Sequence, residues 1–142
     1  MNTIQPTLER FADQKTVVLT TYRRDGTPVD TPVHLAVDGD HAYIRTYETA
    51  FKTKRLRRRP EAELRLASNG TAPAVAALLR PKDAHPVGAP VHVHACELRG
   101  DESRAAAAAL ARKYPLLHGV LIPRMHRLQG TRTVNLELTP VA

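Results

Sequence analysis

The sequence predicts a mainly β protein with about six antiparallel strands and two small helices, which together close as a small barrel. Segments rich in Val, Thr and Leu alternate apolar with polar residues, and this pattern is typical of strands with one buried face. Tight turns separate these segments: Asp25-Gly26 is a strong hairpin signal, and residues 38–40 (Asp-Gly-Asp) form a second turn. No G-x-G-x-x-G follows a strand, which argues against a βαβ dinucleotide-binding fold.

The totals indicate a single domain over residues 1–142. A chain of 142 residues hides roughly 70% of its unfolded surface, so a real core can form. Because aromatic residues make up only 4% of the chain, this core must consist of Val, Leu and Ala. The one cysteine, Cys96, excludes an internal disulfide and favours a reducing cytoplasm. We expect no membrane span and no signal peptide, since neither apolar pattern occurs.

The N-terminal part contains the clearest strand pattern. Residues 5–14 are predicted as a short amphipathic helix, and residues 15–22 as a strand rich in β-branched side chains. The chain returns in a strand over residues 29–37 whose alternate residues are apolar. Pro32 cannot donate to a strand ladder, so we expect an open or edge strand there, with backbone groups available to a ligand. A third strand follows at residues 41–47.

A short basic helix follows the third strand. Thr49 is in position to cap it, residues 50–58 fill it, and Pro60 ends it. Three cations spaced three and four residues apart are expected on one face of this helix: Lys52, Arg55 and Arg59.

The second half contains three strands, a helix and a long loop. Residues 68–90 hold four of the 11 prolines and are interpreted as a loop with one short element at residues 74–79. Asp101 is expected to cap the second helix, whose five successive alanines can lie close to a sheet. The predicted elements are strands at residues 61–67, 91–98 and 131–138 and a helix at residues 102–113.

Positive charge is concentrated around the basic helix. Residues 45–59 carry seven Lys/Arg and one acid, so most of the formal net charge of +7 lies here. This concentration favours a small phosphorylated ligand over a long polyanion, and the scarcity of aromatic residues for base stacking argues against nucleic acid. Lys52 and Arg55 beside the free N–H groups of a first helical turn could bind a phosphate. The alternative is a solvated helix face.

Three further features of the sequence are candidates for binding or chemistry. His92, His94 and Cys96 alternate along one strand face, but no fourth ligand is apparent, so no metal site is predicted. Cys96 lacks a base and an orienting partner, and we expect a buried or partly buried inert thiol. A second basic group could reach a ligand held by the first one if the protein dimerises: Arg124, His126, Arg127 and Arg132.

Several motifs occur together along most of the chain. They are Thr20-Thr21, residues 24–28 (Arg-Asp-Gly-Thr-Pro), 31–34 (Thr-Pro-Val-His), 45–47 (Arg-Thr-Tyr), 51–56 (Phe-Lys-Thr-Lys-Arg-Leu) with Pro60, 115–120 (Pro-Leu-Leu-His-Gly-Val) and 131–134 (Thr-Arg-Thr-Val). In these motifs the chain resembles the pyridoxamine-phosphate-oxidase-like proteins, whose fold is the FMN-binding split β-barrel. Among them it is most similar to the actinobacterial flavin/deazaflavin oxidoreductases that use coenzyme F420.

The resemblance implies a homodimer that binds its cofactor in a groove between the subunits. Residues 50–52 read Ala-Phe-Lys where the phosphate-oxidase relatives have Ser-Arg-Lys, which counts against FMN. Residues 68–90 also depart from the simple strand and turn of the family. By this resemblance, Thr31, Pro32, Val33 and His34 would face the cofactor ring, and Arg45, Thr46, Lys52, Lys54 and Arg55 would hold its phosphate or its acidic oligoglutamate tail.

The expected function is hydride transfer between reduced F420 and a small organic acceptor. The cofactor supplies this chemistry, so no catalytic acid or base is named. The alternatives are an FMN-dependent enzyme of the pyridoxamine-phosphate-oxidase type and a non-catalytic carrier of F420, FMN or haem. Neither a nucleic acid nor a membrane is expected as a partner.

Overall fold

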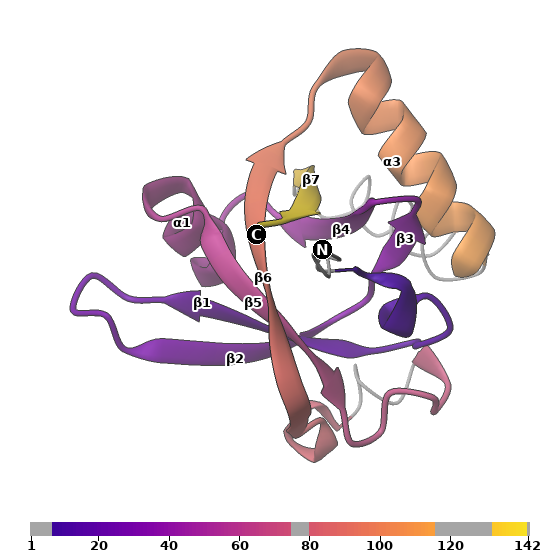
Figure 1. Ribbon diagram of the computed structural model, residues 1–142. Helices are drawn as coiled ribbons and strands as arrows, with labels where there is room; N and C mark the ends of the chain where they lie inside the picture. Colours follow the sequence, from indigo (N-terminus) through magenta and orange to yellow (C-terminus); the bar gives the residue numbers. More distant parts are fainter. Residues whose placement is uncertain (1–6, 75–79, 116–131, 142) are drawn as a thin grey trace, which may run out of the picture.

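A curled antiparallel sheet forms the body of the protein (Figure 1). The computed structural model describes residues 7–74, 80–115 and 132–141. Within these residues the sheet has seven strands in the order β2-β1-β5-β6-β7-β4-β3, and every neighbouring pair is antiparallel. The strands are β1 (Val17–Tyr22), β2 (Pro28–Val33), β3 (Ala36–Asp38), β4 (His41–Tyr47), β5 (Glu61–Ala67), β6 (Pro86–Glu97) and β7 (Thr133–Pro140).

Four helical segments accompany the sheet in the described part of the chain. The two α-helices are α1 (Phe51–Arg58) and α3 (Gly100–Lys113), and the two short 3-10 helices are η1 (Glu9–Phe11) and η2 (Pro81–Asp83). None of the helices in these residues is long and apolar enough to cross a membrane. The mainly β fold with small helices is therefore confirmed.

The sheet has seven strands because the segment expected as one strand at residues 29–37 is divided. Its first part, β2, pairs with β1, and its second part, β3, pairs with β4. These parts lie at opposite ends of the strand order and only two residues separate them, so the curled sheet almost meets itself. Pro32 lies in β2 at an edge of the sheet, as its missing N–H predicts.

An opening remains where the two edges diverge. β3 pairs with β4 only from His41 to Tyr43, and in the described residues no strand pairs with that edge of β4 further on. Helix α1 follows β4 directly and docks at this opening. Thr53 and Leu56 of the helix are buried, and Leu56 belongs to the main core. The side chains of α1 therefore complete the wall that the strands leave open.

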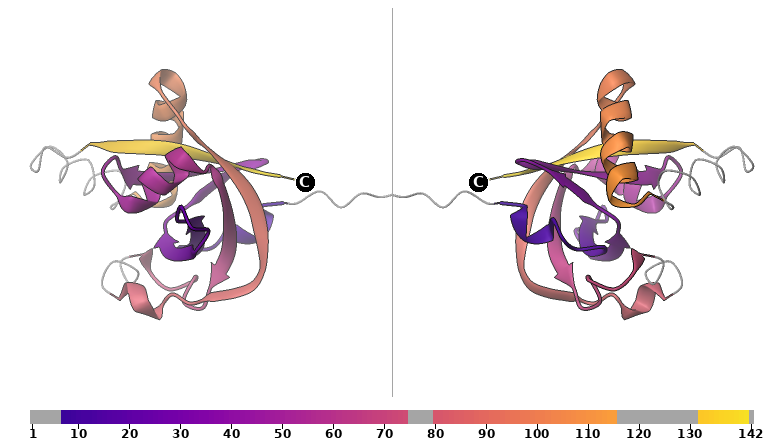
Figure 2. Two further views of the ribbon diagram at one scale, coloured as in Figure 1. Left: turned by 90° about the vertical axis from the view of Figure 1, so that its left-hand side faces the viewer. Right: turned by 90° about the vertical axis from the view of Figure 1, so that its right-hand side faces the viewer.

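The core lies inside the curled sheet, and a second cluster of buried residues lies outside it. Figure 2 shows α3 on the outer side of the sheet. Val17, Leu19, Ile44 and other aliphatic side chains fill the interior, in keeping with the scarcity of aromatic residues. Helix α3 packs on the outer face against β3, β4 and β7. Within the five-alanine run, Ala106 and Ala109 are buried against the sheet, whereas Ala105 and Ala108 are exposed, so one side of the run lies close to the sheet.

Several local expectations are corrected. The N-terminal helix expected at residues 5–14 is only the single turn η1 among the described residues. β6 begins at Pro86, so the loop is shorter than residues 68–90. Neither expected cap is used: Ala50 precedes α1 and Arg99 precedes α3, and no side chain makes a capping hydrogen bond at either. Most of the short element expected at residues 74–79 lies outside the described residues.

Gly70 is expected to be intolerant of any side chain. Its carbonyl oxygen accepts hydrogen bonds from the N–H groups of Lys15 and Thr16, which fix the start of β1. A methyl group at this position would lie 2.9 Å from the carbonyl oxygen of Thr16 and still closer to the Gln14 side chain. We predict that Gly70→Ala lowers the free energy of unfolding by about 1–3 kcal/mol, measured by urea denaturation. An unchanged midpoint would contradict this packing.

Candidate cofactor-binding site at the opening of the barrel

Helix α1 presents chemically different side chains on its different sides. The side that faces the barrel carries Thr53 and Leu56. The Thr53 hydroxyl donates its proton to the carbonyl oxygen of Tyr47 at 2.7 Å, and its oxygen also lies within hydrogen-bond distance, 3.1 Å, of the Thr46 hydroxyl oxygen. Thr46 is itself buried. These bonds tie the first turn of the helix to the end of β4 and thereby orient its other sides.

The side of α1 next to β1, which we call the β1 flank, carries positive charge that has no ion-pair partner among the described residues. Arg55 Nε donates to the Thr21 hydroxyl at 2.7 Å, and the guanidinium of Arg59, just after the helix, lies 4.4 Å from the centre of the Tyr22 ring. Lys52 lies one turn before Arg55, and the charge of Arg55 contributes to lowering the pKa of Lys52. Contacts of both arginines with β1 confirm the common face predicted from their spacing.

Thr21 is a site residue that the sequence reasoning did not assign. It ends the Thr-Thr motif, but its contact with Arg55, which lies 34 positions later, has no local sequence signal. The side chain is fully buried. Its hydroxyl oxygen therefore fixes the guanidinium from the interior side and leaves the other guanidinium N–H groups available for a ligand.

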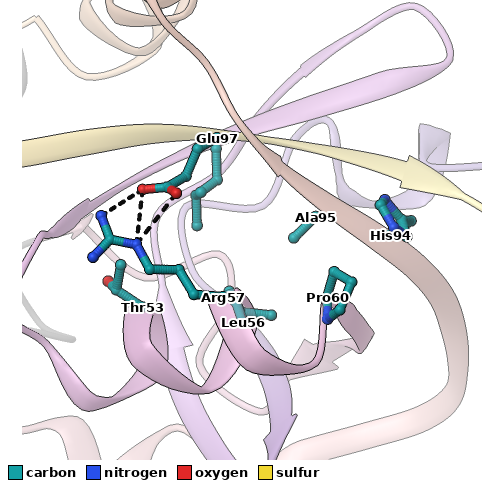
Figure 3. A pocket seen from close by; sticks show the side chains of 8 residues that line it. Thr53, Leu56, Arg57, Pro60, His94, Ala95 and Glu97 are labelled. Carbon is teal, nitrogen blue, oxygen red and sulfur yellow. Dashed lines mark hydrogen bonds and ion pairs between the residues drawn. The ribbon is translucent and has the colours of Figure 1, made fainter.

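The side of α1 next to β6 carries an ion pair (Figure 3). Arg57 Nη2 lies 2.7 Å from Glu97 Oε1, Nε donates to both Glu97 oxygens, and Glu48 lies 3.6 Å away. This contact raises the pKa of Arg57 and lowers the pKa of Glu97. Arg57 is thus compensated by an acid 40 positions later in the chain, whereas the described residues show no ion pair for the cations of the β1 flank.

A pocket of about 280 Å³ lies beside this ion pair, between α1 and strands β6 and β7. Leu56, Ala95 and Leu136 give it apolar walls. Figure 3 shows the Arg57–Glu97 pair at one end and His94 at the other. Because Arg57 is neutralised by Glu97, this side of the helix attracts an anion much less than the β1 flank does.

The cations of the β1 flank are held at an electrostatic cost. Burial and the neighbouring Arg55 lower the pKa of Lys52. Burial, together with Arg23 and Arg58, lowers the pKa of Arg55. Shifts in this direction mean that the surroundings disfavour the charged form. A bound anion would reverse the effect, so the β1 flank has the electrostatics of an anion site.

The first turn of α1 adds backbone donors to this flank. An α-helix leaves its first N–H groups without partners inside the helix, and no side chain caps them here. Thr49, the expected cap, is exposed and makes no capping bond. These N–H groups lie at the same end of the helix as Lys52, and together they have the donor set that a phosphate or carboxylate requires.

The remaining residues predicted to hold the phosphate are distributed over other sides. The Thr46 hydroxyl is hydrogen-bonded to the Thr53 hydroxyl, so Thr46 contributes to the docking of α1 on β4. Lys54 is exposed on the solvent side, with its Nζ 5.6 Å from the centre of the Phe51 ring. Arg45 Nε donates to Asn135 Oδ1 at 3.3 Å, and burial lowers the pKa of this arginine. Asn135 in turn bonds Ser103 of α3.

Successive residues of the segment predicted to face the ring point in alternate directions. Thr31 and Val33 lie opposite Leu19 and Val17 of β1, on the side of the core, whereas Pro32 lies on the other face. What the predicted residues share is therefore the backbone of an edge strand. In the described residues no strand pairs with the outer edge of β2, so a planar ligand could lie along that edge.

His34 lies just beyond β2 and contacts the α3 side of the barrel. Its ring stacks on Tyr114 with centroids 5.0 Å apart, and its Nε2 lies 3.1 Å from the carbonyl oxygen of Ala74. Burial, and then the charge of Lys113, lower the pKa of His34 below its ordinary value of 6.5. The neutral ring is thus part of the folded structure.

Acid should therefore weaken the fold through His34. The unfolded chain takes up this proton at higher pH than the native protein does, so the free energy of unfolding falls as the pH drops below about 6.5. We predict that His34→Gln shows a smaller loss of stability between about pH 7 and pH 5 in urea titrations. His92→Gln, at an exposed position of β6, is the matched control and should retain the full loss. Equal losses in both variants would contradict this role.

The other groups considered from the sequence lie elsewhere. His92, His94 and Cys96 are on the exposed face of β6, so the thiol is exposed and the expectation of a buried cysteine is wrong. Within the described ranges, no three His, Cys, Asp or Glu side chains converge as a metal site would require. Of the second basic group only Arg132 lies in the described residues, whereas Arg124, His126 and Arg127 do not.

Comparison with known proteins identifies the fold. No protein-family model matches the chain, and no curated protein matches it in sequence. Solved structures do match over nearly its whole length. The haem storage protein HutZ from Vibrio cholerae has a TM-score of 0.66 at 14% identity, covering 98% of this chain and 92% of the other. A candidate pyridoxamine 5'-phosphate oxidase from Listeria innocua has a TM-score of 0.59 at 13% identity, covering 95% and 90%.

The fold is a split β-barrel. An F420 reductase is also similar, with a TM-score of 0.55 at 16% identity, covering 99% of this chain and 97% of the other. At such identities the similarity establishes the architecture and leaves the ligand open. In the split barrel of this protein, the divergence of β2 from β4 is the split, and α1 with its β1 flank stands beside it.

Proposed function

We propose that this protein is an F420-dependent oxidoreductase that transfers a hydride from the reduced deazaflavin to a small organic acceptor. The observation that carries the proposal is the β1 flank, where Lys52 and Arg55 meet an uncapped helix N-terminus beside the split. The fold similarity to an F420 reductase supports it. The resemblance of the sequence motifs to those of deazaflavin oxidoreductases points the same way.

The donor set fits the anionic part of such a cofactor. Lys52 and Arg55 offer charge-assisted hydrogen bonds, and the first turn of α1 adds backbone N–H groups. Burial of the two side chains strengthens their attraction for an anion, because fewer water molecules screen it. Arg45, Thr46 and Lys54 are proposed as further contacts of the phosphate or the acidic tail.

The deazaflavin, when bound, supplies the hydride, and the protein binds and orients it. We propose that Thr31, Pro32, Val33 and His34 provide the edge along which the ring lies. The open edge of β2 supports this assignment, because its backbone groups are not used by another strand in the described residues. No acid or base is assigned, since hydride transfer requires position more than protonation.

Loss of the β1-flank cations should weaken cofactor binding. We predict that Lys52→Met and Arg55→Gln each raise the dissociation constant of F420 roughly tenfold to a hundredfold, since a hydrogen bond to a charged group contributes about 1.5–3 kcal/mol. Binding is measured by F420 fluorescence and by the rise in melting temperature that a ligand causes. FMN is titrated in parallel, and tighter binding of FMN would contradict the choice of F420.

Arg57→Gln is the matched control for this experiment. It removes the same charge from the same helix, but Glu97 already neutralises Arg57 on the opposite side. The control should bind F420 as the wild type does. If all three variants lose affinity equally, the effect comes from the overall charge or the stability of α1, and the assignment of the β1 flank is wrong.

A non-catalytic carrier is the second candidate, because HutZ, a haem storage protein, has a similar fold. The two functions differ in turnover. We predict that reduced F420 is oxidised in the presence of a panel of enone and nitro acceptors, followed by absorbance. Tight binding of F420 or haem without turnover of any acceptor would favour the carrier.

We also propose that the protein is a cytoplasmic homodimer in which a second copy completes the cofactor groove. The exposed aromatic side chains next to the β1 flank support this, since Phe51 is 76% and Tyr47 is 37% accessible. Light scattering coupled to gel filtration should give twice the mass of the 15.7 kDa chain. A monomer at micromolar concentration would contradict the groove.

A further inference from the structure

A pocket on the outer face of the barrel is separate from the candidate cofactor site. It has a volume of about 310 Å³ and lies between β3 and the C-terminal end of α3. Figure 1 shows α3 on the right of the sheet and α1 on the left. Its apolar lining includes Ala36, Val37 and Ala109. Its charged lining consists of Asp38, Arg112 and Lys113.

The amine of Lys113 is held at a fixed position. Its Nζ donates to the carbonyl oxygen of Leu35 at 2.6 Å and lies 5.4 Å from the centre of the Tyr114 ring. The Nζ of Lys15 lies 5.9 Å from the centre of the same ring. The face of the ring attracts each ammonium group, but the two positive charges that it brings together at the edge of the pocket repel each other.

Docking of α3 does not require Lys113, because Tyr114 already performs it. The Tyr114 hydroxyl donates to the carbonyl oxygen of Lys15 at 2.8 Å and lies 3.1 Å from the carbonyl oxygen of Leu35, and the N–H of Leu35 donates to the Tyr114 hydroxyl oxygen at 3.2 Å. The ring is buried and also stacks on His34. The half-buried amine next to it is thus available for another role.

The surroundings of Lys113 favour its neutral form. Burial, and then the charge of Lys15, lower its pKa to about 8, and Asp13 opposes the shift only in part. His34, Asp38 and Arg112 are the other titratable or charged groups that belong to this region. At neutral pH the free-amine fraction is then roughly two to three hundred times that of an ordinary lysine. Desolvation and a neighbouring cation are the two means by which proteins make lysine nucleophilic.

We propose that Lys113 is a nucleophilic amine that forms a Schiff base with a small carbonyl compound bearing a carboxylate, with Arg112 binding that carboxylate. The amine nitrogen attacks the carbonyl carbon, and the carbonyl oxygen takes up a proton from solvent. The carbinolamine then loses one water molecule, which leaves a C=N bond in place of the C=O bond. The reaction consumes no oxidant or reductant.

The Arg112 side chain gives the site its ligand class. It is adjacent to Lys113 in the chain, lines the same pocket and is exposed. Asp38 of β3, which lines the same pocket, would repel a second carboxylate on the ligand. A small 2-oxo acid matches this arrangement, because its carbonyl carbon and its carboxylate are directly bonded and can meet neighbouring side chains.

The test is reductive trapping with glyoxylate and cyanoborohydride at about pH 7.5, followed by peptide mapping of the full chain. We expect Lys113 to be modified at least tenfold faster than Lys54 and Lys82, which are exposed. Lys113→Arg retains the charge and should remove the fast phase, whereas Lys82→Arg is the matched control and should leave it unchanged. Modification of Lys113 no faster than of the exposed lysines overturns the proposal.

Arg112 is tested with a second aldehyde. Glycolaldehyde resembles glyoxylate in size but has no carboxylate. We expect Arg112→Gln to slow the trapping of glyoxylate at Lys113 at least threefold and to leave trapping of glycolaldehyde unchanged. Equal effects on both aldehydes overturn the role of Arg112 in selecting the ligand. Because neither assay involves F420, their outcome is independent of the proposed oxidoreductase function.

Discussion

The docking of α1 into the split is the interaction on which the candidate site depends. Hydrogen bonds of the Thr53 hydroxyl with Tyr47 and Thr46, together with the burial of Leu56, fix the helix against the end of β4. Each such bond contributes only about 1 kcal/mol, but together with Leu56 they determine which way every other side chain of the helix points. Without this docking, the cations of residues 51–59 would form an ordinary solvated surface.

The docked helix separates charge into two environments. On one side Arg57 meets Glu97, and the opposite charges neutralise each other. On the other side are Lys52 and Arg55, whose pKa values are lowered by burial and by neighbouring arginines. A concentration of positive charge becomes a site only where it is both partly desolvated and uncompensated. Two nearby positions of one helix therefore hold an arginine in a structural ion pair and an arginine in the candidate anion site.

On the outer face of the barrel, a positive charge is likewise partly desolvated next to another cation. Lys113 is partly desolvated beside another lysine, as Lys52 is beside Arg55. An arginine retains its charge at any accessible pH, so it can relieve such strain only by binding an anion. A lysine can also lose its proton, and its neutral form is a nucleophile. The same electrostatic cost thus underlies both the proposed anion site and the proposed nucleophilic lysine.

The sequence by itself determined the strands, the turns and the basic helix, because these depend on local preferences. Gly26 and Gly39 adopt positive φ in the two expected turns, and the period of two places Val17 and Leu19 inward. The tertiary structure alone decided the break after Val33, the pairing of Arg57 with Glu97 and the environment of Lys113. Each of these depends on residues that are distant in the chain and become neighbours only when the sheet curls, so no local pattern encodes it.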